Sequence, residues 1–149
     1  MTVGKPPVES LPPCVIFDLD GTLALLGDRS PFDASTCEQD EINEAVRFIH
    51  RMIATSSPET AIILLSGRDD RWRPETERWL HAHGITHQAL YMRPTGDFRK
   101  DAVLKKEIYQ RQIEGKYQVI VVFDDRDQVV KLWRDDLGLP CFQVAWGDF

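Results

Sequence analysis

The residues best suited to chemistry stand where a short apolar segment ends. Residues 14–17, Cys-Val-Ile-Phe, run directly into Asp18-Leu19-Asp20-Gly21-Thr22. Side chains two apart on an extended segment point to the same side, so the carboxylates of Asp18 and Asp20 are expected to face one ligand. Gly21 then lets the chain turn sharply. Two carboxylates therefore share one pocket, and such a pocket is suited to binding a cation.

A second acidic pair, Asp124 and Asp125, follows another apolar segment. If that segment is a neighbouring strand, four carboxylates converge, and such crowding is tolerable only where a cation neutralises it. A hard divalent ion with oxygen ligands, Mg²⁺ above all, meets that need. Any one of these acids alone would be explained as the cap of a turn or helix. An EF-hand calcium loop is excluded, because its sixth and twelfth positions would be Leu23 and Arg29 instead of glycine and glutamate.

The elements that must position these residues alternate along the chain. Apolar, β-branched segments predict strands, which we place at residues 14–17, 60–65, 88–92, 119–123 and 141–144. Apolar spacings of three and four, together with Pro and Gly at the ends, predict helices at residues 41–53, 74–83, 98–113 and 127–137. This order predicts an α/β fold, a Rossmann-like parallel sheet with helices on both faces. Ligands are expected at the carboxyl ends of its strands.

The size and charge of the chain fit one such domain. The sequence has 149 residues, 18 basic and 24 acidic side chains, and a formal net charge of −6. We expect a domain at residues 14–149 after a flexible, proline-rich lead-in at residues 1–13. The acidic balance argues against a broad contact with duplex nucleic acid, but it permits a local basic pocket for one phosphate or one strand end.

The cysteines and apolar runs bear on the cellular compartment. Cys14, Cys37 and Cys141 are scattered without the Cys-x-x-Cys spacing of a zinc site, which favours a reducing compartment over a disulfide framework. The longest apolar runs have five residues, at 61–65 and 119–123, far below the ~18 that a membrane-spanning helix needs. No signal-peptide core precedes them. We therefore expect a cytoplasmic protein with no membrane segment.

Taken together, these motifs resemble the haloacid dehalogenase superfamily of phosphotransferases. The superfamily pattern comprises Asp-x-Asp-Gly-Thr after a strand, a serine that ends the second strand, a downstream lysine and a final Asp-Asp. Within it, the chain is similar to the 3′-phosphatase domain of bacteriophage polynucleotide kinase/phosphatase. That similarity is carried by residues 17–24, Arg29, residues 66–68, 99–101, Lys105, residues 124–130, 133–134 and 143–149. It covers nearly everything after residue 13.

The resemblance implies a Mg²⁺-dependent hydrolysis of a terminal 3′-phosphate in two steps. Asp18 would attack phosphorus and form an aspartyl-phosphate. Asp20 would protonate the leaving 3′ oxygen and then, as a carboxylate, activate the water that releases phosphate. The family pattern holds Mg²⁺ by Asp18, by the backbone carbonyl of Asp20 and by the pair Asp124 and Asp125. Which member of that pair binds directly stays open.

Other matched positions are expected to hold the phosphate. Ser66 would donate its hydroxyl to a phosphoryl oxygen, and the ammonium of Lys105, which falls on the motif where Lys106 does not, would balance developing charge. Arg29, Arg68, Arg93 and Asp101 match further positions that matter in the phage-type enzymes. Arginine suits the planar, bidentate recognition of phosphate oxygens.

Two of the assignments keep an alternative. Asp101 either orients one of the arginines or favours the start of its own helix, where the dipole is positive. Among the tryptophans, Trp79 and Trp133 are expected in the core because they lie in amphipathic helices. Trp72 is the one to test for contact with a base.

The spacing of the motifs bears on the substrate. Residues 23–60 have room for a flap and one helix, and residues 69–97 for one helix and a short strand, so no large cap domain covers the site. An uncovered site can admit the 3′-phosphorylated end of DNA or RNA. No Gly-x-x-x-x-Gly-Lys-Ser/Thr loop is present, so a 5′-kinase or ligase would be a separate partner. Two alternatives stay open, a nucleotidase that acts on free mononucleotides and a non-catalytic module that binds nucleic-acid ends.

Overall fold

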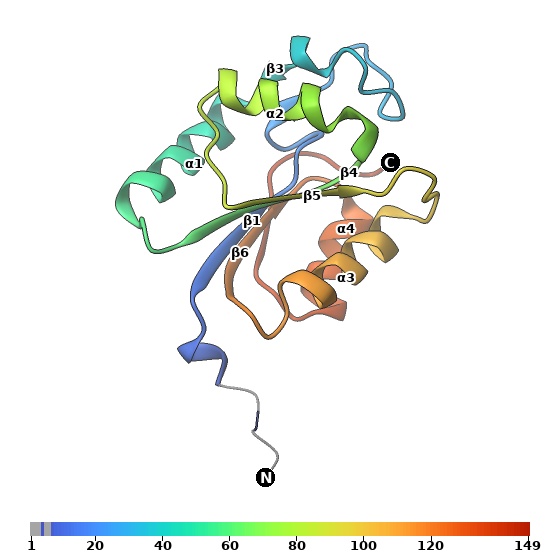
Figure 1. The fold of residues 1–149 in the computed structure, drawn as a ribbon. Helices are drawn as coiled ribbons and strands as arrows, with labels where there is room; N and C mark the ends of the chain where they lie inside the picture. The colour runs from blue at the N-terminus through green and yellow to red at the C-terminus, as the bar shows by residue number, and fades with distance from the viewer. Residues whose placement is uncertain (1–3, 5–6) are drawn as a thin grey trace.

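A five-stranded parallel sheet forms the centre of the computed structural model, which describes residue 4 and residues 7–149 (Figure 1). The strand order is β5-β4-β1-β6-β7. The strands are β1 (Pro13–Phe17), β4 (Ala61–Asp69), β5 (Ala89–Arg93), β6 (Gln118–Asp124) and β7 (Cys141–Gln143). Because all four strand pairs are parallel, the carboxyl ends of the strands lie along one edge of the sheet.

Helices cover both faces of this sheet (Figure 1). The helices are α1 (Glu44–Ser56), α2 (Arg73–Ala82), α3 (Asp101–Gln112) and α4 (Asp127–Lys131). One apolar core lies between the sheet and α1 with α2, and includes the buried Trp79. The other lies between the sheet and α3 with α4, and includes Trp133, which is fully buried. The predicted α/β fold and the core positions of both tryptophans are confirmed.

A small ribbon stands above the carboxyl edge of the sheet. Its strands β2 (Ala24–Leu25) and β3 (Glu41–Ile42) pair in antiparallel fashion, and we call residues 24–42 the flap. The prediction of a helix from residue 41 was wrong at its start, because residues 41 and 42 belong to β3. The helix begins after Asn43, whose side-chain oxygen accepts a hydrogen bond from the backbone N–H of Ala45 at 3.2 Å. Among the described residues, no larger cap is inserted.

Several other boundaries differ from the predicted ones. The helix expected at residues 98–113 begins at Asp101, and the one expected at 127–137 is α4 followed by a π-helical turn at Leu132–Asp136. The strand expected to end at residue 65 continues to Asp69 after an irregularity in its pairing. The flexible lead-in predicted for residues 1–13 falls partly outside the described residues and stays a prediction. Within it, Val8–Ser10 form a 3₁₀ turn.

Two further findings concern the cysteines and the helices. The three cysteines are free thiols, and all three are buried. No helix in the described part of the chain is both long enough and apolar enough to cross a membrane.

His50 of α1 makes the stability of the fold depend on pH. Its side chain is 2% exposed, its Nε2 lies 2.8 Å from the carbonyl oxygen of Thr86, and its ring packs edge-on against Phe17. Burial lowers the pKa of His50 below its ordinary value. The unfolded chain therefore takes up the proton more readily than the folded one. The contribution of neutral His50 to stability is complete above about pH 6.5 and is lost as the pH falls below that value.

We expect His50→Gln to reduce this dependence, because glutamine can still donate to the carbonyl of Thr86 but does not titrate. Between about pH 7 and pH 5, the free energy of unfolding of the wild type should fall more steeply than that of the variant, by up to about 1.4 kcal/mol per pH unit. Urea denaturation at several pH values measures the free energy of unfolding of the wild type and of the variant. His81→Gln, at an exposed position of α2, is the control. Parallel curves for the wild type and His50→Gln would contradict this explanation.

Candidate active site

Three buried carboxylates gather at the carboxyl edge of the sheet. Asp18 directly follows β1, Asp124 ends β6, and Asp125 comes next in the chain. Each offers one oxygen to a group whose atoms all lie within 4.8 Å of one another. The backbone joins them as well, since the N–H of Asp18 donates to the carbonyl of Phe123 at 3.0 Å. We call Asp18, Asp124 and Asp125 the acidic triad.

Lys105 supplies the positive charge beside the triad. It lies on the second turn of α3, and its Nζ donates to Asp18 Oδ1 at 2.9 Å and to Asp124 Oδ2 at 3.0 Å. Burial alone would lower the pKa of Lys105, but the charges of Asp124 and Asp18 outweigh it and raise that pKa. The ammonium therefore stays charged at any physiological pH. Its exposed neighbour Lys106 takes no part in these contacts.

The single positive charge of Lys105 does not balance the negative charges of three carboxylates. This excess of negative charge affects the pKa values of the carboxyl groups. Burial, and then the charge of Asp124, raise the pKa of Asp18 well above its ordinary value. Burial also raises the pKa of Asp125. A cation bound among these oxygens would remove the cost of ionising both groups, and an all-oxygen donor set is the one that Mg²⁺ prefers. The triad therefore fits the metal that the sequence predicts.

The two acids after β6 have different surroundings. Asp124 accepts hydrogen bonds from Lys105, from Trp133 Nε1 at 3.2 Å and from the backbone N–H of Asp125 at 2.8 Å. Asp125 accepts only a long contact of 3.5 Å from the hydroxyl of Thr22, which bonds Asp18 more closely at 3.1 Å, among the described residues. Asp125 thus keeps more of its ligand capacity free.

Gly21 makes room for Asp125. Its φ is +86°, a conformation that L side chains rarely adopt, and a Cβ built there would lie 2.1 Å from Asp125 Oδ2. The glycine that was expected only to turn the chain also lets the carboxylate of Asp125 approach the loop after β1.

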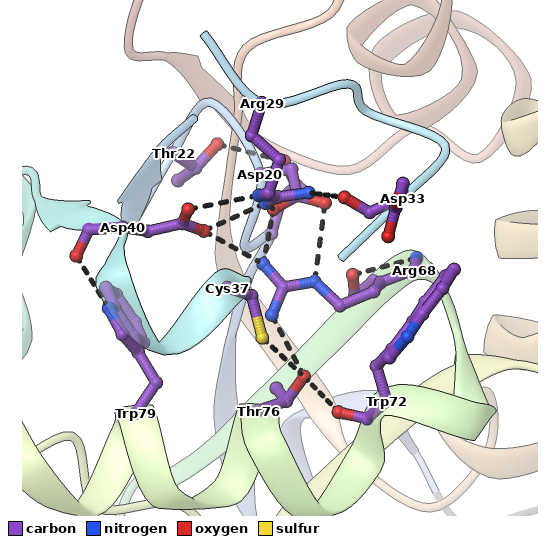
Figure 2. Close-up of polar contacts among 12 residues, drawn as sticks. Asp20, Thr22, Arg29, Asp33, Cys37, Asp40, Arg68, Trp72, Thr76 and Trp79 are labelled. Atoms are coloured by element: carbon purple, nitrogen blue, oxygen red, sulfur yellow. Dashed lines mark hydrogen bonds and ion pairs between the residues drawn. The ribbon is translucent and has the colours of Figure 1, made fainter. Parts of the chain in front are cut away.

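The carboxylate of Asp20 lies outside the triad, which differs from the expectation that four carboxylates converge. Figure 2 shows its carboxylate between two guanidinium groups. Arg29 Nη2 donates to Asp20 Oδ1 at 2.9 Å, and Arg68 pairs with the same oxygen through Nη2. The physical reason is that β1 ends at Phe17, so the alternation of a strand does not extend to Asp20. Its backbone carbonyl stays a predicted metal ligand.

Asp40 completes this arginine network and was missed by the sequence analysis. Lying on the flap just before β3, it accepts from Arg29 Nε at 3.0 Å and Nη2 at 2.8 Å. Thr76 of α2 accepts from Arg68 Nη1 at 2.9 Å (Figure 2). No motif in the sequence marks either residue. The network fixes the flap and Asp20 relative to the sheet.

Ser66 stands on β4 at the same edge and is 1% exposed. Its Oγ accepts from the backbone N–H of Arg68 at 3.0 Å, so its own hydroxyl proton is left to donate. Among the described residues, the backbone N–H groups of Leu19 and Asp20 donate to no backbone carbonyl. These donors suit an anion beside Asp18.

Asp101 stands at the start of its helix and also pairs with arginines, so it fits both of the roles that the sequence left open. It begins α3, and its carboxylate pairs with Arg93 and with Arg126 Nη1, the latter at 3.1 Å. Arg93 is otherwise occupied by backbone carbonyls, with Nε donating to Gly67 at 2.8 Å. Arg29, Arg68 and Arg93 all bind protein groups in this structure. Direct contact of these arginines with phosphate stays a prediction.

Residues 143–149 pack against the backbone of Asp125 and Arg126 and support it. Gln143 Nε2 donates to the carbonyl of Asp125 at 2.9 Å, and Arg126 Nε donates to the carbonyl of Phe149 at 2.9 Å. The carbonyl of Gly147 accepts from the N–H of Asp127 at 2.9 Å. A Cβ at Gly147 would lie 1.8 Å from the backbone oxygen of Asp125.

We therefore expect Gly147→Ala to displace Asp125 or detach the tail, because backbone atoms cannot rotate away as a side chain can. Affinity for Mg²⁺ should fall about ten-fold or more, as it does when the support of a metal ligand is lost. Isothermal titration with Mg²⁺ measures the change. Ala145→Ser, at an exposed position of the same tail, should leave the affinity unchanged. Equal affinities for Gly147→Ala and the wild type would show that the tail does not support Asp125.

Known proteins resemble this chain in sequence and in fold. The family model of the polynucleotide kinase phosphatase domain matches residues 12–149. A putative bifunctional polynucleotide kinase/RNA ligase of Autographa californica nuclear polyhedrosis virus is 37% identical over 134 residues, which cover 89% of this chain and 19% of the viral protein. A chain of the Pnkp1/Rnl/Hen1 complex superposes with a TM-score of 0.91 and 49% identity, over 94% of this chain and 48% of that one.

More distant neighbours share the fold alone. The class C acid phosphatase from Bacillus anthracis has a TM-score of 0.60 at 15% identity, over 80% of this chain and 54% of that one. The chain spans less than half the length of the viral relative and of the repair-complex chain. With the match to the family model over residues 12–149, these similarities show that the chain belongs to the phosphatase-domain family of polynucleotide kinase, within the haloacid dehalogenase superfamily.

Proposed function

We propose that this domain is a Mg²⁺-dependent polynucleotide 3′-phosphatase that acts in nucleic-acid end repair. The observation that carries the proposal is that Asp18 and Asp20 have different surroundings at the edge of the sheet. Asp18 lies in the buried triad beside Lys105, while Asp20 is held apart by Arg29 and Arg68. One carboxylate thus belongs to the triad, which would hold the metal, and the other lies outside it, and this suits a nucleophile and a separate general acid.

In the first step, an oxygen of Asp18 attacks phosphorus and the bond to the 3′ oxygen breaks. The leaving oxygen takes a proton from Asp20, and an aspartyl-phosphate remains on Asp18. In the second step, the carboxylate of Asp20 takes a proton from water, whose oxygen attacks the same phosphorus. Phosphate leaves, Asp18 is regenerated, and Asp20 is protonated again.

The other residues stabilise charge and orientation in both steps. Ser66 would donate its hydroxyl to a phosphoryl oxygen, and Lys105 would offset negative charge near Asp18. The triad and the backbone carbonyl of Asp20 would hold Mg²⁺, which when bound lessens the repulsion between carboxylate and phosphate. Asp125 is the better placed of the final pair to bind directly, since Lys105 and Trp133 already occupy Asp124.

The arginines would serve this chemistry through Asp20. Arg29 and Arg68 fix the carboxylate with charge-assisted hydrogen bonds, and their own side chains are 6% and 1% exposed. Such burial favours a positioning role over direct contact with an incoming phosphate.

The lack of a large cap in the described part of the chain supports a polymer end as the substrate. Among the described residues, the segment between β1 and β4 holds only the flap and α1, and this small insertion would let the 3′ end of DNA or RNA enter. The names of the viral kinase/ligase and of the solved RNA repair complexes support a role beside a kinase or ligase, here as a partner of this domain. A nucleotidase is the second candidate, because the same chemistry would serve free mononucleotides.

The experiment compares phosphate release from a single-stranded oligonucleotide with a 3′-phosphate, from the same oligonucleotide with a 5′-phosphate, and from 3′- and 5′-mononucleotides. Each is assayed with Mg²⁺ and with a chelator, and Asp18→Asn controls for contaminating phosphatases. We expect the 3′-phosphorylated oligonucleotide to be preferred, and only with Mg²⁺. Preference for mononucleotides would replace the proposal by the nucleotidase. Binding of the oligonucleotide without release from any substrate would favour a non-catalytic module.

A further inference from the structure

We propose that Trp72 and Arg71 form a stacking platform for the base of the nucleotide that carries the 3′-phosphate. This inference deepens the proposed function and rests on it, because it takes the leaving group to be the nucleoside at a strand end. The ligand is an unpaired base, of any identity, since every base offers a π-face.

Hydrogen bonds connect Trp72 to Asp20 through Thr76 and Arg68. Trp72 ends the 3₁₀ turn Asp70–Trp72, which directly follows β4 at the carboxyl edge of the sheet. The hydroxyl of Thr76 donates to the carbonyl of Trp72 at 2.7 Å and accepts from Arg68 Nη1 at 2.9 Å. Arg68 in turn holds Asp20, the proposed acid for the leaving oxygen.

Trp72 is more exposed than the two tryptophans of the core. Trp79 and Trp133 are 2% and 0% exposed, and their indole N–H groups donate to Asp40 and Asp124. Trp72 is only half-buried, and no hydrogen bond from its indole N–H is found within the described residues. Its packing in the core is thus incomplete, and part of the residue is exposed to solvent.

Arg71 extends the platform. Its guanidinium carbon lies 5.1 Å from the centroid of the Trp72 ring, and its side chain is 52% exposed. Asp69 anchors both ends of this residue, accepting from its backbone N–H at 2.8 Å and pairing with its Nη2 at 3.1 Å. A planar cation stacked on an indole presents two surfaces on which a base can stack.

The test removes the base from the substrate and the ring from the protein. Two single-stranded oligonucleotides of one sequence carry the 3′-phosphate on an ordinary nucleotide or on an abasic residue. For the ordinary end, Trp72→Leu should lower kcat/KM roughly ten-fold, in line with the loss of one stacked base. For the abasic end, the kcat/KM of Trp72→Leu should stay within about two-fold of the wild-type value. Trp72→Phe, which keeps an aromatic face, should retain most of the preference for the base.

Two further variants keep the test decisive. Arg71→Ala changes an exposed side chain and leaves the packing of the inner side of the Trp72 ring intact, so a folding defect is not expected. It should cause a smaller loss of kcat/KM than Trp72→Leu, and only for the oligonucleotide with the ordinary end. Phe48→Leu removes an aromatic ring that is 58% exposed on α1, a different element from the 3₁₀ turn, and should change kcat/KM for neither substrate.

The failure of the platform can be told from the failure of the proposed function. If the wild type releases the 3′-phosphate but Trp72→Leu and Arg71→Ala lower kcat/KM equally on both ends, or not at all, the platform is wrong and the function stands. If the wild type releases phosphate from neither oligonucleotide, both are overturned.

Discussion

Asp18→Asn is expected to abolish phosphate release and to leave the fold intact. Asparagine keeps the size of the side chain but cannot attack phosphorus, and the catalytic steps act as a unit. Turnover should therefore fall by at least about a thousand-fold. Burial and the charge of Asp124 raise the pKa of Asp18, so its ionised form is costly in a metal-free protein. A neutral side chain removes that cost.

Thermal unfolding provides the accompanying readout. In metal-free buffer, the melting temperature of Asp18→Asn should equal or exceed that of the wild type. Added Mg²⁺ should raise the melting temperature of the wild type more than that of the variant, because a ligand that binds only the folded state stabilises it and the variant has lost a carboxylate of the triad. Turnover above a trace in a folded Asp18→Asn protein would refute the assignment of the nucleophile.

Lys105→Met is expected to impair both stability and turnover. Its ammonium is 3% exposed and lies between Asp18 and Asp124. Methionine of similar length would leave two buried carboxylates without their cation, and the loss of one partner from a buried pair costs about 3–5 kcal/mol of unfolding free energy. Turnover should fall about a hundred-fold or more, because the positive charge beside the transferring phosphate is gone.

Lys106→Met is the matched control, since Lys106 is the adjacent residue on the same helix and is exposed. Chemical denaturation in metal-free buffer gives the stabilities, and Mg²⁺ should restore part of the loss in Lys105→Met by neutralising the same carboxylates. If Lys105→Met and Lys106→Met were equally stable and equally active, Lys105 would not be the cation of the site.

The alternation of apolar segments was sufficient to predict the sheet and the edge at which the site lies, because buried parallel strands and amphipathic helices have different periods. The start of α1 was mispredicted for a related reason. Ile42 continues the spacing of Ala45 and Val46, yet it pairs with Ala24 as part of the two-residue strand β3. Strands of two residues are too short to show an alternation.

The orientation of Asp20 could not be predicted from its spacing. The inference required an extended backbone through Asp20, but β1 ends at Phe17. The partners of the arginines were equally hidden, because carboxylates and phosphates present the same planar, bidentate arrangement of oxygens to a guanidinium. A sequence shows that Arg29 and Arg68 suit an oxyanion, and only the structure shows that the carboxylates of Asp20 and Asp40 take that place.

The function of the closing residues was hidden as well. Gly147 matches the family pattern, but the reason that a glycine is needed there is the close approach of its backbone to Asp125, which no local sequence pattern encodes.

The most direct test of the mechanism is to trap the phosphorylated enzyme. Asp20→Asn should still form the covalent intermediate on a phosphate monoester whose leaving group needs no proton, such as an aryl phosphate, but should hydrolyse it slowly because the general base is missing. With radiolabelled phosphate, Mg²⁺ and an acid quench, we predict a hydroxylamine-labile label on the peptide that contains Asp18. Release of labelled phosphate with no label on the protein at any time, or undiminished release in the presence of chelator, would contradict the account.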